Sequence, residues 1–187
     1  MQVAPAIELL RVEDYLAGEQ SSELRHEYLG GMVYAMAGAS DAHNTIALNL
    51  AAELRSSLRG GSGRTFIGDM KAHIVIGGRD VFYYPDVMVT CDARDTKPYF
   101  KEFPKLIVEV LSETTENTDR REKFWNYTQI ESLQEYILIA QDKREVTIFQ
   151  RDKNWDAQIL GESDQQLTIT SLNLQLPLNA IYEGVAF

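Results

Sequence analysis

The segment 106–111 constrains the fold of this chain more than any other stretch of its sequence. It reads Leu-Ile-Val-Glu-Val-Leu, a nearly continuous apolar run with the length of one strand. Such a run predicts a central strand that is covered on both faces, because a strand with one solvated face alternates apolar and polar residues. The chain therefore needs a sheet with a packed layer on each side.

Glu109 lies inside this run, on the strand face that also carries Ile107 and Leu111. An ionised carboxylate in such a strand costs free energy unless a cation or several hydrogen-bond donors meet it. A purely structural explanation is a strand-end glutamate that pairs with a neighbouring Arg or Lys. We favour a functional role, because buried acids with shifted pKa values cluster at functional sites.

The rest of the chain predicts an α/β (α+β) fold in which helices pack on a mixed sheet. Apolar spacing and capping residues predict helices at 11–18, about 40–59 and 119–130. We therefore predict a single domain over 1–187 whose core, at about 40–150, runs helix, three strands, helix, strand. Strand-like segments are expected at 64–67, 71–76, 81–90, 106–111, 135–140 and 146–150, with an N-terminal hairpin at 25–36 and C-terminal strands near 155–160 and 167–176.

The net charge of −10 is concentrated at the two ends of the chain. Residues 1–31 carry six acidic residues against two basic ones, and residues 154–187 carry four acidic residues and no basic one. The nearly neutral middle is compatible with a nucleic-acid substrate, although tight non-specific coating of nucleic acid is disfavoured. The single cysteine, Cys91, and the absence of a membrane-length apolar run favour a cytoplasmic protein without membrane contact.

Asp86 follows a proline in the segment Tyr84-Pro85-Asp86-Val87. Proline removes a donor from the strand ladder, so it belongs at an edge or an irregularity. An acid placed just after such a break can point into a cleft. A turn aspartate that accepts a bond from its own backbone is an equally good explanation of Asp86 taken alone.

Two carboxylates on strands form a rigid oxygen site for a hard divalent cation. Mg²⁺ typically binds one or two protein carboxylates and keeps several waters. Chemistry at a phosphate also uses a fixed positive charge, and Asp119, Lys123 and Tyr127 share one helical face at i, i+4 and i+8. Lys123 could reach back to the Glu109 strand, although an exposed Asp119–Lys123 pair would explain the same spacing.

Together these motifs resemble the Uma-two family of "putative restriction endonucleases", over about residues 10–150. The family is placed in the PD-(D/E)xK nuclease superfamily, whose core has the helix, three strands, helix, strand order predicted above. The residues that carry the resemblance are Tyr84-Pro85-Asp86-Val87, the segment 109–115, Asp119, Lys123 and Tyr127, the segment 27–31 with Met36-Ala37, Ser40 with His43, and the segment 133–138.

The resemblance implies that Asp86 and Glu109 bind Mg²⁺ or Mn²⁺ and that Lys123 is the catalytic lysine. The superfamily motif places lysine two positions after its second acid, but Leu111 occupies that position here. Members of the family carry the lysine on the following helix, where Lys123 stands. The carbonyl of Val110 would be the third ligand in such folds.

Glu27, His43 and Tyr127 are additional candidates for the site. Glu27 resembles the acids that early elements contribute in some nucleases of the superfamily, although a solvated residue on a hairpin edge is nearly as good an explanation. His43 could orient a phosphate or a water, whereas a histidine near a helix cap is the more common case. His26 and His73 have no spacing that indicates a zinc site.

The expected function is metal-dependent endonucleolytic hydrolysis of phosphodiester bonds in nucleic acid, with DNA favoured and a homodimer compatible with cutting both strands. One alternative is a catalytically inactive nuclease-fold module that binds nucleic acid or a protein partner. Another is a metal-dependent hydrolase of small phosphorylated compounds. Four basic residues between the two acidic motifs could line the path of the nucleic-acid backbone or form a solvated loop: Arg94, Lys97, Lys101 and Lys105.

Overall fold

The structure is a computed structural model that describes residues 9–113 and 115–187. Its helices are α1 (Val12–Glu19), α2 (Asp41–Ser57), α3 (Glu116–Thr118), the π-helical turn η1 (Asp119–Lys123), α4 (Phe124–Thr128) and α5 (Leu178–Ile181), with 3₁₀ turns η2 (Arg151–Lys153) and η3 (Thr170–Leu172). Its strands are β1 (His26–Leu29), β2 (Met32–Ala35), β3 (Arg64–Ile67), β4 (Lys71–Ile76), β5 (Arg79–Tyr83), β6 (Val87–Thr90), β7 (Phe100–Lys101), β8 (Pro104–Leu111), β9 (Glu135–Ala140), β10 (Val146–Gln150), β11 (Ala157–Leu160), β12 (Gln166–Ile169) and β13 (Leu174–Pro177).

A six-stranded mixed sheet forms the centre of the fold, with the strand order β11-β10-β9-β8-β6-β3. Strand β8 pairs parallel with β9 and antiparallel with β6. In chain order, α2 is followed in this sheet by β3, β6 and β8, then by the segment α3-η1-α4, and then by β9. The predicted order of helix, three strands, helix and strand is confirmed.

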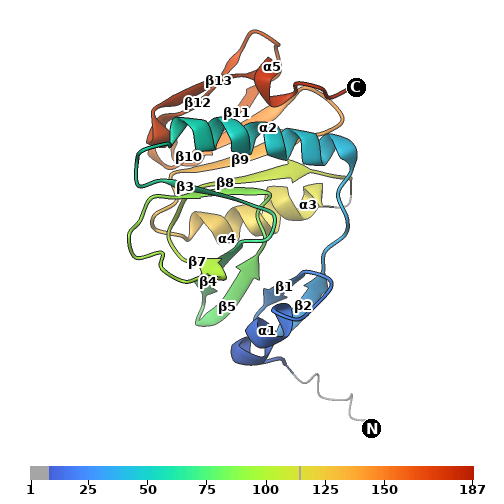
Figure 1. Cartoon of the computed structure of the whole chain (residues 1–187), viewed down its shortest axis with the longest axis vertical. Helices are drawn as coiled ribbons and strands as arrows, with labels where there is room; N and C mark the ends of the chain where they lie inside the picture. Colours follow the sequence, from blue (N-terminus) through green and yellow to red (C-terminus); the bar gives the residue numbers. More distant parts are fainter. Residues whose placement is uncertain (1–8, 114) are drawn as a thin grey trace.

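The two faces of β8 pack against different layers, as its continuous apolar sequence requires. Val108 and Val110 pack with the α2 residues Ile46 and Leu50, in a cluster that also includes the C-terminal strands and α5. The opposite face, with Ile107 and Leu111, packs with α4 and with β4 and β5. Figure 1 shows α2 on one side of the central sheet and α3 and α4 on the other. Glu109 therefore points toward the α4 side.

The segment 81–90 was predicted as one strand, and this prediction is wrong. Strand β5 ends at Tyr83 in the five-stranded sheet, and β6 begins at Val87 in the six-stranded sheet. The intervening Tyr84-Pro85-Asp86 leaves the ladder because Pro85 has no N–H to donate and restricts the backbone before it. The chain thus crosses from one sheet to the other at Asp86.

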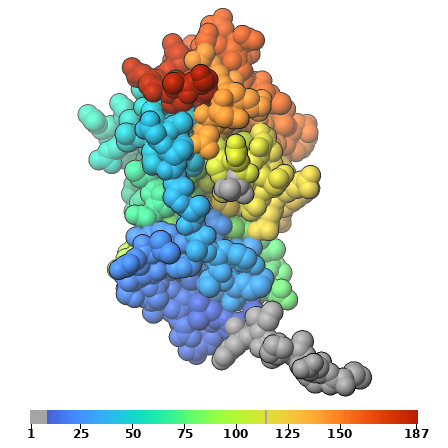
Figure 2. Space-filling view, turned by 90° about the vertical axis from the view of Figure 1, so that its right-hand side faces the viewer, coloured from blue at the N-terminus to red at the C-terminus, as the bar shows by residue number. Residues whose placement is uncertain are grey.

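A second sheet, absent from the sequence prediction, has the strand order β2-β1-β5-β4-β7. The predicted hairpin around Gly30-Gly31 forms its edge as β1 and β2, and both glycines have positive φ (57° and 107°), as a tight two-residue turn requires. Figure 2 shows the first elements of the chain at the end of the molecule opposite the C-terminal strands. Strand β1 lies beside β5, so Glu27 comes near the crossing at Asp86.

The predicted helix 119–130 is a composite of η1 and α4 that ends at Thr128 and is preceded by the short α3. The predicted tail segment 167–176 is a pair of antiparallel strands, β12 and β13, with Asn173 in the left-handed region at φ 49° between them.

Across 9–113 and 115–187, no helix is long and apolar enough to cross a membrane.

Candidate active site

Asp86 and Glu109 lie next to each other where the two sheets meet. The Val110 amide of β8 donates to Oδ2 of Asp86 at 2.6 Å, and the Asp86 amide lies 3.4 Å from Oε2 of Glu109. The Asp86 side chain is 18% exposed, whereas that of Glu109 is 3% exposed. The two acids are neighbours, with Asp86 at the solvent edge and Glu109 behind it.

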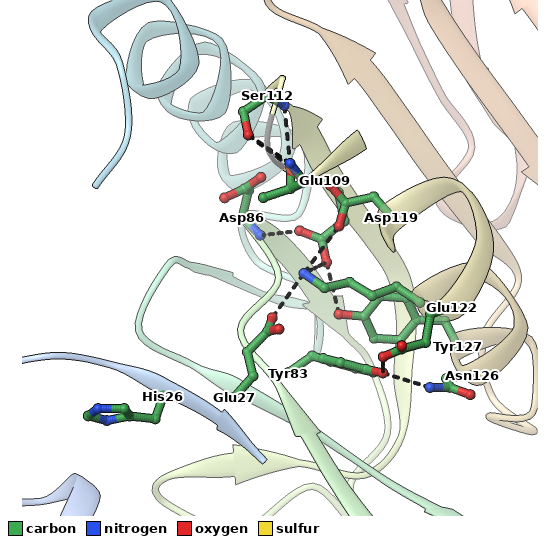
Figure 3. Close-up of polar contacts among 12 residues, drawn as sticks. His26, Glu27, Tyr83, Asp86, Glu109, Ser112, Asp119, Glu122, Asn126 and Tyr127 are labelled. Carbon is green, nitrogen blue, oxygen red and sulfur yellow. Dashed lines mark hydrogen bonds and ion pairs between the residues drawn. The ribbon is translucent and has the colours of Figure 1, made fainter. Parts of the chain in front are cut away.

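Lys123 occupies the centre of a ring of carboxylates. Its Nζ lies 2.9 Å from Glu27 Oε1, 3.3 Å from Glu109 Oε1 and 3.2 Å from Asp119 Oδ1. Figure 3 shows these three carboxylates converging from β1, β8 and η1. The turn η1 keeps Asp119 and Lys123 on one side, so both can face the end of β8. The sequence left open whether Lys123 reaches Glu109 or forms an exposed pair with Asp119; Lys123 lies beside Glu109, and its pair with Asp119 is buried.

Tyr127, one turn further along the helix, donates its hydroxyl to Oε1 of Glu109 at 2.9 Å. Tyr83 packs against Tyr127 at 5.4 Å between ring centroids and donates to Oε1 of Glu122 at 2.8 Å. Asn126 Nδ2 in turn donates to the Tyr83 hydroxyl at 2.6 Å. These bonds fix the helical segment against the end of β5 (Figure 3).

His43 joins the cluster from the first turn of α2. Its Nε2 lies 3.2 Å from Oδ2 of Asp86, and its Nδ1 is buried without a hydrogen-bond partner among the described residues. The N-cap Ser40 accepts a bond from the His43 amide at 3.1 Å, which fixes the position of the histidine backbone. His43, Glu27 and Asp86 are the partly exposed members of the cluster, at 15%, 16% and 18% of their side chains.

The electrostatics of the cluster are dominated by burial and by an excess of acids. Burial raises the pKa of Glu109 well above its ordinary value, against the opposing charge of Lys123 and with the help of Asp119 and Asp86. Burial alone would lower the pKa of Lys123, but Glu109, Asp119 and Glu27 outweigh it and raise that pKa. Lys123 is therefore held as a cation in a cluster that carries more acids than bases.

Burial also opposes the charged form of His43, but the hydrogen bond and charge of Asp86 outweigh it and raise the pKa of the imidazole. Asp86 thus has two neighbours that favour its ionised form, the backbone amide of Val110 and the imidazole of His43. The imidazole is held beside the solvent edge of the cluster in a form that can donate hydrogen bonds.

The donor set suits a hard divalent cation. Oε2 of Glu109 has only the long contact from the Asp86 amide, and Oδ1 of Asp86 accepts no hydrogen bond from the described residues. Across these residues, no group of three or more His, Cys, Asp or Glu side chains is arranged to hold a metal ion. Mg²⁺ needs only one or two carboxylates when water and phosphate complete its coordination, so the two acids fit an open site and not a closed cage.

A second buried polar network lies behind the cluster and involves α1. Glu19, which is 7% exposed, accepts the Tyr84 hydroxyl at 2.5 Å and the His26 amide at 3.2 Å. Lys71 Nζ donates to the Tyr84 hydroxyl at 3.1 Å. His26 precedes Glu27, and Tyr84 lies two residues before Asp86, so this network holds the backbone that carries two acids of the site. His26 itself stands apart from the cluster (Figure 3).

We expect Glu19→Gln to lower the free energy of unfolding by about 1–3 kcal/mol at pH 7, because buried bonds to a charged acceptor are lost. Burial would raise the pKa of Glu19, but its bonds from Tyr84 and His26 outweigh burial and lower that pKa from 4.5. A carboxylate with a lowered pKa stabilises the fold above its unfolded pKa, and this contribution disappears as the pH falls through the folded value.

Urea denaturation at pH 7 and at about pH 3 measures this effect, with the exposed Glu23→Gln as the matched control. The difference between wild type and Glu19→Gln should shrink as the pH falls, because a group whose folded-state pKa is lowered loses its stabilising contribution as the pH falls toward and through that pKa. A difference that stays the same at both pH values would contradict the role assigned to the Glu19 charge.

The four basic residues between the two acidic motifs do not all face solvent, so they do not together line a path for a nucleic-acid backbone. Lys101 is buried and donates to the carbonyls of Asp95 and Lys97. Arg94 pairs with Asp92 at 2.6 Å and stacks on Phe103 at 3.9 Å. Lys97 and Lys105 keep solvent-accessible side chains. Burial of Lys101 inside its own loop thus removes one of the four candidates.

The sequence underestimated two members of the cluster. Asp119 was expected as a helix-surface partner of Lys123, but it is 2% exposed and its carbonyl accepts the Tyr136 hydroxyl at 3.0 Å. Tyr83 was treated as a strand residue only. Its position directly before the break at Tyr84-Pro85-Asp86 was the available signal, because it places Tyr83 only three residues from Asp86.

The fold is that of a nuclease-like α/β protein. It matches a crystal structure from Anabaena variabilis described as "a putative nuclease belonging to DUF820", with a TM-score of 0.76, 17% identity, and coverage of 93% of this chain and 98% of that chain. The chain belongs to the Uma2 family, described as "Putative restriction endonuclease", whose model matches residues 12–179.

Two relatives from Synechocystis cover most of the chain. The one named "Uncharacterized protein slr1290" is 36% identical over 180 residues, which cover 95% of this chain and 94% of its own length. The other, "Uncharacterized protein sll1609", is 31% identical over 169 residues, which cover 87% of this chain and 94% of its own. The similarity includes both sheets, and so the elements that carry the cluster.

Proposed function

We propose that the protein is an endonuclease that hydrolyses phosphodiester bonds in DNA and depends on Mg²⁺ or Mn²⁺. The observation that supports this most directly is Lys123 Nζ held 3.3 Å from Glu109, in a cluster that reaches solvent at Asp86. The combination of two neighbouring acids, a fixed cation and an open edge is what phosphodiester hydrolysis needs. Family membership is consistent with the proposal.

Asp86 and Glu109 would hold the cation through the oxygens that their protein contacts leave free. Bound there, Mg²⁺ or Mn²⁺ would polarise the phosphate and lower the pKa of a coordinated water. Tyr127 orients Glu109 by donating to its other oxygen at 2.9 Å. Val110 orients Asp86 in the same way through its amide, at 2.6 Å.

Lys123 acts as a fixed positive charge and not as a base. Its raised pKa keeps the ammonium protonated, so it donates hydrogen bonds and stabilises the negative charge that develops on the phosphate oxygens. Glu27 and Asp119 hold the ammonium in place beside Glu109. His43 can donate to a phosphate oxygen at the solvent edge, because its raised pKa favours the imidazolium form.

A second candidate is a nuclease-fold module that binds nucleic acid or a protein without cutting it. The observation that favours it is the burial of Lys123 and Glu109, which are 7% and 3% exposed and already neutralise each other. A substrate would reach the cluster only through its edge at Asp86, Glu27 and His43. In that case the cluster would hold the two sheets together and catalyse nothing.

Two measurements separate the candidates. The first is calorimetric titration of Mn²⁺ into the wild type, Asp86→Asn and Glu109→Gln, repeated in the presence of a short DNA duplex because open sites bind metal weakly without phosphate. The second is cleavage of supercoiled plasmid and of single-stranded DNA and RNA in Mg²⁺, Mn²⁺ or EDTA. Binding that both substitutions abolish, with EDTA-sensitive cleavage, is the expected result. Absence of Mn²⁺ binding together with absence of cleavage under every condition would leave only the binding module, and cleavage that persists in EDTA would contradict the metal dependence.

The proposal includes a homodimer, because one site cuts one strand and duplex cleavage needs two. Sedimentation equilibrium of the full chain, with and without a duplex, measures the assembly state. A monomer in both conditions would restrict the proposal to cleavage of single strands or to nicking of a duplex.

A further inference from the structure

A pocket of about 340 Å³ lies at the C-terminal end of α2, between that helix and the start of β3. Arg55, Arg59 and Arg64 line it, together with the glycine-rich turn 60–63, and none of its lining residues is acidic. Its volume is within the range of about 300–1,000 Å³ that is usual for pockets that bind small ligands. His43 and Asp86 do not line this pocket, so it is separate from the carboxylate cluster.

The three arginines keep their charges unneutralised. Within the described part of the chain, none of them forms an ion pair with a carboxylate, although the protein carries a net charge of −10. Arg55 lies in the last turn of α2, and Arg59 lies two residues beyond the end of that helix, so the helix end and the turn that follows it both contribute an arginine to the pocket. An anion bound in the pocket would therefore meet positive charges that no carboxylate of the described residues already pairs with.

Capping of the helix does not require these side chains. The end of a helix attracts cations because its last carbonyls are free. Here the Leu54, Ser56 and Leu58 carbonyls already accept bonds from the amides of Leu58, Arg59 and Gly61, at 3.0, 3.3 and 3.1 Å. These backbone bonds also weaken the repulsion that the carbonyls would exert on an anion in the pocket.

Arg64 is held in position before any ligand arrives. Its Nη2 donates to the Asp95 carbonyl at 2.6 Å, and its guanidinium lies 5.6 Å from the centre of the Phe66 ring. The ammonium of Lys101 lies 5.3 Å from the same ring centre. Burial lowers the pKa of Lys101, and the charge of Arg64 lowers it further while Asp95 raises it.

We propose that this pocket binds a phosphate group, supplied either by a nucleic-acid backbone or by a free phosphate ester. Guanidinium groups bind phosphate oxygens through pairs of parallel hydrogen bonds, and a cluster of them without acids selects anions. Arg55 lies twelve residues from His43 along α2, or about 18 Å at 1.5 Å per residue. That separation equals the rise of about five nucleotides of one strand along the duplex axis, at 3.4 Å each. One duplex is therefore long enough to contact both the pocket and the carboxylate cluster.

The test is a titration of the full ¹⁵N-labelled chain, in EDTA, with inorganic phosphate, with thymidine 5′-monophosphate and with a 20-base-pair duplex. We expect saturable NMR shifts of the amides in the turn 60–63 and of the arginine Nε–H groups. The double substitution Arg55→Gln/Arg59→Gln should weaken phosphate binding at least tenfold. Arg79→Gln is the matched control, because Arg79 is also exposed and forms no ion pair with a described residue.

The arms of the experiment distinguish the source of the phosphate. Two results together identify a nucleic-acid backbone. The duplex and inorganic phosphate compete, and the slope of the logarithm of the duplex binding constant against the logarithm of salt concentration becomes shallower by about one to two in the double variant. Binding of phosphate or the mononucleotide without the duplex identifies a free ester. Absence of saturable shifts with all three probes, or equal affinities in the double variant and the wild type, overturns the proposal. No arm measures cleavage, so failure of the proposed nuclease activity would be seen separately.

Discussion

Asp86→Asn is expected to slow cleavage of DNA by about a hundredfold to a thousandfold, since the loss of metal-assisted charge stabilisation costs several kcal/mol of the barrier. The substitution removes one negative charge from the solvent edge of the cluster and keeps the size of the side chain. The amide oxygen of asparagine can still accept the Val110 N–H that Asp86 accepts at 2.6 Å. The fold should therefore survive with a loss of stability below about 2 kcal/mol.

Single-turnover cleavage at saturating Mg²⁺, together with Mn²⁺ calorimetry, measures this effect. Asp164→Asn is the matched control, because Asp164 is exposed in the turn between β11 and β12 and far along the chain from the cluster. Cleavage by Asp86→Asn within threefold of the control would contradict a role for this carboxylate. A large loss of activity that accompanies unfolding would leave the role undecided, so circular dichroism is recorded on the same samples.

Lys123→Met is expected to lower the free energy of unfolding by about 3–5 kcal/mol, because removal of one partner leaves buried charges unpaired. The substitution leaves Glu27, Glu109 and Asp119 without the ammonium that lies 2.9–3.3 Å from each of them. For a chain of this length, each kcal/mol corresponds to roughly 2–4 °C in Tm. Activity should be lost at the same time, because no fixed cation remains beside Glu109.

Urea denaturation of Lys123→Met beside Lys143→Met tests this prediction. Lys143 pairs with Glu145 at 3.0 Å, but its side chain is 58% exposed, so solvent screens the pair and its loss should change the denaturation midpoint little. The double variant Lys123→Met/Glu109→Gln should be more stable than Lys123→Met alone, since it also removes one of the carboxylates left unpaired. Equal midpoints for the two single variants would contradict the electrostatic account of the cluster.

The sequence was sufficient to predict the central sheet and to propose Glu109 and Asp119 as neighbours of Lys123. The apolar run 106–111 predicted a strand covered on both faces, which is present. Helical spacing left open whether Lys123 reaches Glu109 or forms an exposed pair with Asp119, and the structure has the contact with Glu109. These features depend on local periodicity, which a single sequence displays directly. The roles of Asp86, Glu109 and Lys123 in catalysis stay predictions.

The five-stranded sheet and the crossing at Asp86 were not predicted. Residues 81–90 are apolar on both sides of Pro85, so their pattern does not reveal that two halves of the segment belong to different sheets. Pairing of β1 with β5 joins residues more than fifty positions apart, and periodicity carries no information on such contacts. The approach of Glu27 to Lys123 depends on that pairing, which explains why both accounts of Glu27 remained open.

The position of Lys123 between β1, β8 and η1 also affects how related sequences should be compared. An ion pair that holds three elements together would be retained by a descendant that had lost its chemistry, because its removal would endanger folding. The lysine is therefore a poor diagnostic of activity among homologues. Asp86, whose side chain is partly exposed and whose replacement by asparagine should cost little stability, is the better marker for sorting active lineages from degenerate ones.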